Sequence, residues 1–279
     1  MIDVMAVLLP VEGPGDPRVA DFVGLRERSA DDDCGWLVAE GPMVVRQLLA
    51  SDYRLRSILV TERGLRALAA DIDALDGPVL VADQPVLDAV CGFHFHRGAL
   101  ASADRRPLPD FASLAADADL LLLLEGVNDH ENLGALFRNA AAFGVGAVAV
   151  DATCADPLYR RSVRVSMGHV LRMPFARVAD WPSALPVLDE RGFETVALTP
   201  ATDAEDVGAV APRGRRALLV GSEGWGLTAA TLAAADRRVR IPIAPGVDSL
   251  NVATAAAVVL HRLAPPPGPA QPTGSSPRR

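Results

Sequence analysis

The stretch IPIAPGVDSLNVATAAAVVLHRL, residues 241–263, decides the fold. Its apolar start predicts a short strand over 239–243, which Pro245 and Gly246 end. A loop then leads into Ser249-Leu250-Asn251, and the Ala-rich run that follows predicts a helix. Such a helix start offers a hydroxyl, an amide side chain and free backbone N–H groups at one point. The alternative is an ordinary N-cap on a well-packed helix.

In each of two upstream segments, a strand also ends in a loop or helix start whose residues could take part in binding or catalysis. In ALLVGSEGWGLT, residues 217–228, an apolar strand stops at Gly221 and a glycine-rich loop surrounds Glu223. This composition predicts a main chain that approaches another group closely. In residues 120–151, an apolar strand ends at Glu125, and the following helix carries Asn132 and Arg138 six residues apart. At 3.6 residues per turn they lie about 120° apart and flank one broad helix face.

The three segments, in this order, resemble the signature motifs of the SpoU/TrmH family of RNA ribose 2'-O-methyltransferases, which belongs to the SPOUT class. The resemblance covers roughly residues 120–263. The matching residues are Asn132, Gly134 and Arg138 in the first motif, Gly221, Glu223, Gly224, Gly226 and Leu227 in the second, and Ile241, Pro242, Ser249, Leu250, Asn251 and Val252 in the third. The chain departs from the family at Asp129-His130-Glu131, where members often have Asp-Pro.

The resemblance implies an α/β protein: a SPOUT-type α/β domain with a C-terminal trefoil knot, preceded by a small L30e-like α/β domain. It implies S-adenosylmethionine as the cofactor and the ribose 2'-hydroxyl of RNA as the methyl acceptor, ribosomal RNA being favoured over transfer RNA. It also implies a homodimer through the knotted domains. The residues expected to hold the cofactor are Gly221, Ile241 and Leu250, with Thr199. The expected catalytic residues are Arg138, Asn132, Glu223, Ser249 and Asn251.

Arg138 is the residue that the resemblance assigns to activation of the 2'-hydroxyl. A guanidinium stays protonated at ordinary pH, so we expect it to bind a phosphate and stabilise the emerging alkoxide. The alternative is a helix-surface salt bridge with Glu131 or Glu125. Asn132 either orients Arg138 or the ribose, or merely caps its helix.

The domain organisation follows from changes in pattern. Strands alternating with short helices over residues 36–103 predict a small α/β unit. Ala39–Gly41 and Gly92–Gly98 resemble parts of the L30e-like substrate-binding domain. We predict an RNA-binding domain over 1–103 with a loose start over about 1–20, a linker over 104–117, a methyltransferase domain over 118–264 and a disordered tail over 265–279. Catalytic-domain strands are predicted near 119–125, 146–151, 173–178, 193–199, 216–221 and 239–243.

The charge distribution gives mixed evidence about RNA. A net charge of −8 argues against a nucleic-acid binder, but phosphate contacts are short-range and depend on local charge. All 27 cationic residues are arginine. Residues 158–172 contain Arg160, Arg161 and Arg164 and no acid, which predicts an RNA-facing edge or, alternatively, a solvated helix face. His96 and Arg97 are also expected to contact RNA; a metal held by His94 and His96 is less favoured, because no third ligand is near in sequence.

Other classes of protein fit less well. No GxGxxG follows the strand that ends at Glu125, which excludes an ordinary dinucleotide-binding fold. The three cysteines, Cys34, Cys91 and Cys154, match no zinc pattern, and no apolar run is long enough for a membrane span. The N-terminus lacks a basic start, so we predict a cytoplasmic protein. We also predict no metal, because the implied methyl transfer requires none and the sequence suggests none. The alternatives left open are a transfer-RNA 2'-O-methyltransferase, a non-catalytic RNA-binding SPOUT protein and a small-molecule methyltransferase.

Overall fold

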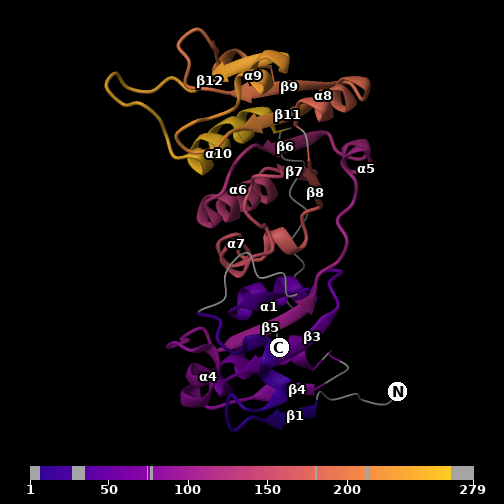
Figure 1. Ribbon diagram of the computed structural model, residues 1–279, viewed down its shortest axis with the longest axis vertical. Helices are drawn as coiled ribbons and strands as arrows, with labels where there is room; N and C mark the ends of the chain where they lie inside the picture. Colours follow the sequence, from indigo (N-terminus) through magenta and orange to yellow (C-terminus); the bar gives the residue numbers. More distant parts are fainter. Residues whose placement is uncertain are drawn as a thin grey trace, which may run out of the picture.

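Two sheets, one in each half of the chain, organise the computed structural model, and the two halves stack along its long axis (Figure 1). The structure describes residues 7–26, 35–73, 75, 78–179, 181–211 and 214–264. The first sheet has the order β1-β4-β3-β5-β2, and the second has the order β10-β12-β9-β11-β6-β7-β8. The fold is therefore α/β in both halves, as predicted. The predicted tail over 265–279 lies outside the described residues.

The N-terminal sheet combines parallel and antiparallel pairs. Its strands are β1 (Val7–Pro10), β2 (Trp36–Glu40), β3 (Leu55–Val60), β4 (Pro78–Val81) and β5 (Ala99–Asp104). Its helices are η1 (Pro17–Phe22), α1 (Pro42–Leu49), α2 (Glu62–Ala67), α3 (Ala69–Ile72) and α4 (Gln84–Cys91). β4 pairs in parallel with β1 and β3, whereas β5 runs antiparallel to β3 and β2. The alternation predicted from residue 36 onward is present.

The predicted loose start of the chain is more ordered than expected from about residue 7 onward. β1 adds an edge strand to the sheet, and η1 buries Val19 and Phe22 completely. The Pro and Gly residues at 10–17 hid these two short elements, because they break the periodicity on which the prediction depends.

The C-terminal sheet is parallel throughout. Its strands are β6 (Leu120–Leu124), β7 (Ala147–Asp151), β8 (Phe175–Val178), β9 (Phe193–Leu198), β10 (Glu205–Asp206), β11 (Arg215–Val220) and β12 (Arg237–Arg240). Its helices are α5 (Phe111–Ala116), α6 (His130–Ala142), α7 (Arg160–Val165), η2 (His169–Leu171), α8 (Trp181–Glu190), η3 (Val207–Ala209), α9 (Ala229–Ala234) and α10 (Val252–Leu263). Every residue of β6 is buried, as expected for a central strand covered on both faces. The six predicted strands are present, and the two-residue β10 was not predicted.

Two predicted boundaries differ from the structure. β12 ends at Arg240 rather than Ile243, because Pro242 has no N–H for a ladder hydrogen bond. In the predicted linker, Asp104 belongs to β5, and α5 begins after Asp110, whose carboxylate accepts a hydrogen bond from the Ser113 N–H. Ala115 of α5 is buried in the apolar cluster of the C-terminal sheet. Within the linker, residues 105–110 and 117 lack regular structure.

Helix α7 lies between α6 and the N-terminal half (Figure 1). One cluster of buried apolar side chains includes residues of both sheets, so the two halves share a continuous core. None of the described helices is long and apolar enough to cross a membrane.

Candidate functional site

One side chain from each of the three motifs meets at a single point. The Asn132 amide donates to Oε1 of Glu223, and Asn251 Nδ2 donates to Asn132 Oδ1 at 2.8 Å. Asn251 Nδ2 also lies 3.4 Å from Oε1 of Glu223. These residues come from the start of α6, the loop after β11 and the start of α10. The structure thus brings together three of the five predicted catalytic residues.

Helix capping places two of these side chains. Asp129 Oδ1 accepts a hydrogen bond from the Asn132 N–H at 2.8 Å, so Asp129 caps α6. Asp129 begins the segment 129–131, in which the sequence departs from the family pattern. Asn251 Oδ1 accepts hydrogen bonds from the N–H groups of Ala253 and Thr254 at 3.0 and 3.1 Å. Asn251 therefore caps α10 with its oxygen and bonds Asn132 with its nitrogen, and the two roles considered for this helix start occur together.

The loop after β11 folds tightly on itself. Ser222 and Gly226 exchange two backbone hydrogen bonds, of 3.2 and 3.0 Å. A Cβ on Gly221 would lie 2.0 Å from the carbonyl carbon of Gly226, so this position accepts only glycine without a shift of the loop. Trp225, at the loop tip, is 93% exposed.

A residue that sequence reasoning did not place in the site fixes the end of this loop. Glu125, at the end of β6, is buried, and its Oε1 accepts a hydrogen bond from the Thr228 N–H at 2.9 Å. The signal in the sequence was an acid directly after five leucines. Because Glu125 bonds the loop, it is not the salt-bridge partner considered for Arg138.

The segment between β12 and α10 exposes its main chain. Residues 242–251 are all exposed, and within the stretch 242–250 the structure records one hydrogen bond, from the Val247 N–H to the Ala244 carbonyl at 3.3 Å. Ser249 and Leu250 lie on this exposed segment, and Ile241 is half-buried at its start. Thr199, at the end of β9, is buried, and its N–H donates to the Val239 carbonyl.

Arg138 is exposed on α6 and pairs with no carboxylate among the described residues. Glu131, the other acid considered for it, lies 4.0 Å from Arg161 instead. The neighbouring His169 has a lowered pKa, because it is partly desolvated and because the positive charges of Arg138 and Arg172 oppose its protonation. Arg138 is thus a cation open to an anionic ligand.

The predicted RNA-facing residues divide into two groups. Arg161, His96 and Arg97 are exposed. Arg160 and Arg164 instead donate to Oε1 and Oε2 of Glu40 in the N-terminal half, at 2.9 and 3.2 Å. This placement differs from the predicted edge, because the acid that pairs with them lies 120 and 124 residues away in the sequence.

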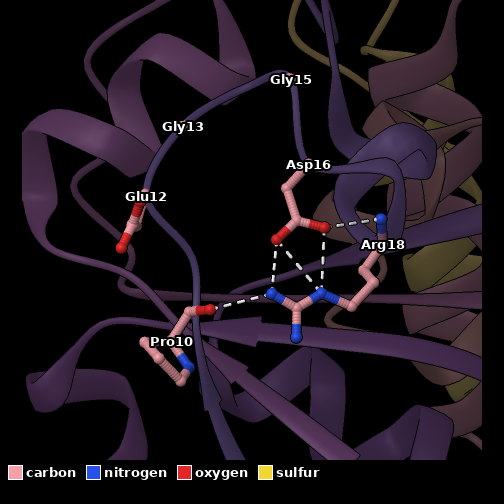
Figure 2. Close-up of a pocket in the computed structure, with 6 residues that line it drawn as sticks. All are labelled: Pro10, Glu12, Gly13, Gly15, Asp16 and Arg18. Carbon is pink, nitrogen blue, oxygen red and sulfur yellow. Dashed lines mark hydrogen bonds and ion pairs between the residues drawn. The ribbon is translucent and has the colours of Figure 1, made fainter.

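A hollow in the N-terminal half has no part in this cluster. Figure 2 shows its lining, in which Arg18 bonds Asp16 and the Pro10 carbonyl. The hydrogen bonds from Arg18 lower the pKa of Asp16 to about 2. Arg18, the cation in this hollow, is therefore already paired with a carboxylate. No residue of the three motifs lines the hollow.

The parallel sheet and the three converging motifs define a methyltransferase of the SpoU class. Residues 119–261, about half of the chain, match the model of the SpoU rRNA Methylase family, and the chain belongs to this family.

Three similar proteins illustrate the relationship. An uncharacterized tRNA/rRNA methyltransferase of Mycobacterium tuberculosis is 49% identical over 89% of this chain and 88% of its own length. The crystal structure of an RNA 2'-O ribose methyltransferase is 28% identical, with a TM-score of 0.74 over 91% of this chain and 98% of the other. An AdoMet-bound rRNA methyltransferase from Sinorhizobium meliloti shares the fold at 24% identity, with a TM-score of 0.78 over 92% of this chain and 97% of the other.

Proposed function

We propose that the protein transfers a methyl group from S-adenosylmethionine to the ribose 2'-hydroxyl of a specific nucleotide in ribosomal RNA. The observation that carries this proposal is the hydrogen-bonded cluster of Asn132, Glu223 and Asn251. Asn132 lies on α6, the helix that also presents Arg138, and Arg138 pairs with no carboxylate among the described residues. Membership of the SpoU family and the similarity to a 2'-O ribose methyltransferase support the reaction type. The family's description as rRNA methylases favours ribosomal RNA.

The residues around the cluster fit S-adenosylmethionine. The exposed main chain of 242–250 offers donors and acceptors that can satisfy adenine edges, and the loop at Gly221 has no side chain to obstruct them. Gly221, Ile241 and Leu250 would hold the cofactor through main-chain groups, with Thr199 at the end of β9. The neighbour from Sinorhizobium meliloti, which carries AdoMet, supports S-adenosylmethionine as the cofactor. When bound, the cofactor supplies an electrophilic methyl group.

The chain's own residues then position the acceptor and stabilise charge. Arg138 would bind the phosphate beside the acceptor ribose. Its fixed positive charge would stabilise the negative charge that develops on the 2'-oxygen as the hydroxyl proton passes to water, since a guanidinium cannot accept that proton. The hydrogen bonds among Asn132, Glu223 and Asn251 hold α6, the loop after β11 and α10 in one arrangement, which is what an in-line displacement requires. The exposed hydroxyl of Ser249 completes the polar rim.

The proposal includes a C-terminal trefoil knot. The chain leaves β12, which pairs with β9 and β10, and reaches α10, which packs against α6 and β11. The segment 241–251 therefore connects β12 to a helix packed against β11 and α6, and the proposed knot requires this part of the chain to pass through a loop of the domain.

The proposal also includes a homodimer in the cytoplasm, with an L30e-like N-terminal domain that binds RNA. Support for the dimer comes from apolar side chains exposed on the site loops and on α10, namely Trp225, Val247, Leu250 and Val258. A second copy packed there would remove this apolar area from water.

The test uses labelled S-adenosylmethionine with unmodified ribosomal and transfer RNA, followed by nuclease digestion and nucleoside chromatography. Label in a 2'-O-methyl nucleoside of ribosomal RNA is the expected result. Label only in transfer RNA would refute ribosomal RNA as the substrate and identify transfer RNA instead. Label on a base would refute the assignment of the ribose 2'-hydroxyl as the acceptor.

A further inference from the structure

We propose that Glu40 is a positioning residue that locks the N-terminal half to α7, and through α7 to α6 with Asn132 and Arg138. The proposal rests on the proposed function, because the orientation of the two halves matters when one RNA contacts both. Neither the family membership nor the similar proteins assign a role to Glu40.

The ion pair at this position is buried and shared. Glu40 ends β2, and its side chain is 1% exposed. One carboxylate oxygen accepts from Arg160 and the other from Arg164, whose side chains are 19% and 25% exposed. The two arginines are four residues apart and so lie on one face of α7. A carboxylate this deeply buried depends on its partners, because removing one leaves an uncompensated charge out of water.

Both sides of α7 are packed without slack. On the α6 side, a Cβ on Gly134 would lie 2.7 Å from the Ser162 carbonyl oxygen and 2.8 Å from Val165 Cβ. On the N-terminal side, a Cβ on Gly168, which follows α7, would lie 2.6 Å from Gln47 Cβ of α1. A movement of the N-terminal half against α7 would therefore reach α6 directly, since interiors packed at this density transmit displacement.

A second ion pair joins the halves at another point. Arg105, just after β5, pairs with Asp156 before α7 and donates to the Trp36 carbonyl at 3.3 Å. Two separate charged contacts resist rotation about either one. We infer that the halves form one rigid body at this interface.

Rigidity at Glu40 fixes the spacing of groups proposed to bind RNA. Exposed Arg97 lies beside Gly41, the residue after Glu40, with its Cβ 3.7 Å from where a Gly41 Cβ would be. Arg161 is exposed next to Arg160, and Arg138 lies on α6. Cations of both halves are thus held at set distances from the cluster of Asn132, Glu223 and Asn251. This spacing selects an acceptor RNA of matching shape. The buried ion pair at Glu40 would then contribute to substrate specificity rather than to stability.

The test compares Glu40→Gln with Glu62→Gln, a matched control at an exposed acid of α2 whose ion-pair partner among the described residues is Arg66 on the same helix. The full chain is measured for KM toward unmodified ribosomal RNA, kcat, S-adenosylmethionine affinity and the radius of gyration by X-ray scattering. For Glu40→Gln we expect KM for RNA to rise about tenfold or more and the radius of gyration to increase, with cofactor affinity unchanged. Glu62→Gln should match the wild type in all four.

Wild-type KM and scattering in Glu40→Gln would overturn the proposal, as would an equal loss of cofactor affinity, which indicates general disruption. If Glu40→Gln does not fold, Arg164→Gln decides instead, since it leaves the Arg160–Glu40 pair in place and should give smaller changes in the same direction. A wild-type protein that methylates no RNA would refute the proposed function, while scattering would still test the rigid interface.

Discussion

Replacement of Gly221 by alanine tests the loop that we propose to hold the cofactor. The new Cβ would lie 2.0 Å from the Gly226 carbonyl carbon and 2.2 Å from the Leu227 nitrogen. Ordinary carbon contacts are about 3.5 Å or longer, so this main chain must move by about 1.5 Å. The shift breaks the two hydrogen bonds between Ser222 and Gly226, each worth about 1 kcal/mol, and partly exposes Leu227, whose full burial contributes about 1.5–3 kcal/mol.

The expected loss is about 3 kcal/mol of unfolding free energy, which corresponds to a Tm lowered by roughly 6–12 °C. Affinity for S-adenosylmethionine should fall at least tenfold, because the displaced main chain is the proposed ligand contact. Thermal denaturation and titration calorimetry measure both. Gly13→Ala is the control, since nothing lies within 4 Å of a Cβ there. A Gly221→Ala protein with wild-type Tm and cofactor affinity would refute the reasoning.

Substitutions at three further residues test the site and its surroundings. Arg138→Ala should abolish methyl transfer in the labelled-cofactor assay yet keep cofactor affinity within about twofold, since its role is electrostatic; retained turnover would remove it from the mechanism. Asn251→Ala should lower the unfolding free energy by about 1–2 kcal/mol in urea denaturation, while Asn251→Ser restores the cap but not the bond to Asn132, so its stability should recover without activity. The pKa of His169 is lower in the folded protein than in the unfolded chain, so as the pH falls the unfolded state takes up the proton at a higher pH. The free energy of unfolding should therefore decrease as the pH drops below about 6.5. His169→Gln should flatten this dependence in urea unfolding, and an unchanged slope would contradict it.

The residues of the candidate site could be selected from the sequence, but their geometry could not. Asn132, Glu223 and Asn251 were selected by their place in three motifs, and the structure joins them across 91 and 119 residues of chain. No periodicity encodes that meeting, since it depends on how the segment after β12 crosses the sheet. The two roles considered for the helix start at 249–251, cap and binding site, could not be separated, because Asn251 fills the cap with its oxygen and bonds Asn132 with its nitrogen.

The function of Arg160 and Arg164 shows a different limit of sequence reasoning. An arginine cluster without nearby acids reads as a nucleic-acid edge, but burial depends on which distant side chain faces it. Glu40, in the N-terminal half, pairs with two of these arginines, so they lie at the contact between the two halves. The three motifs indicated which residues to select, whereas the resemblance at Ala39–Gly41 gave no sign that Glu40 pairs with arginines of α7.

The exposed indole of Trp225 makes the loop after β11 its own optical probe. The chain has three tryptophans; Trp181 is buried and Trp36 is half-buried, so Trp225 contributes the water-relaxed, red-shifted part of the emission. A soluble quencher such as iodide would reach it first. Any molecule that covers this loop, whether nucleoside, RNA or a second copy of the chain, would shield it and shift its emission to shorter wavelength. Occupancy of the site can therefore be followed in unlabelled protein in real time.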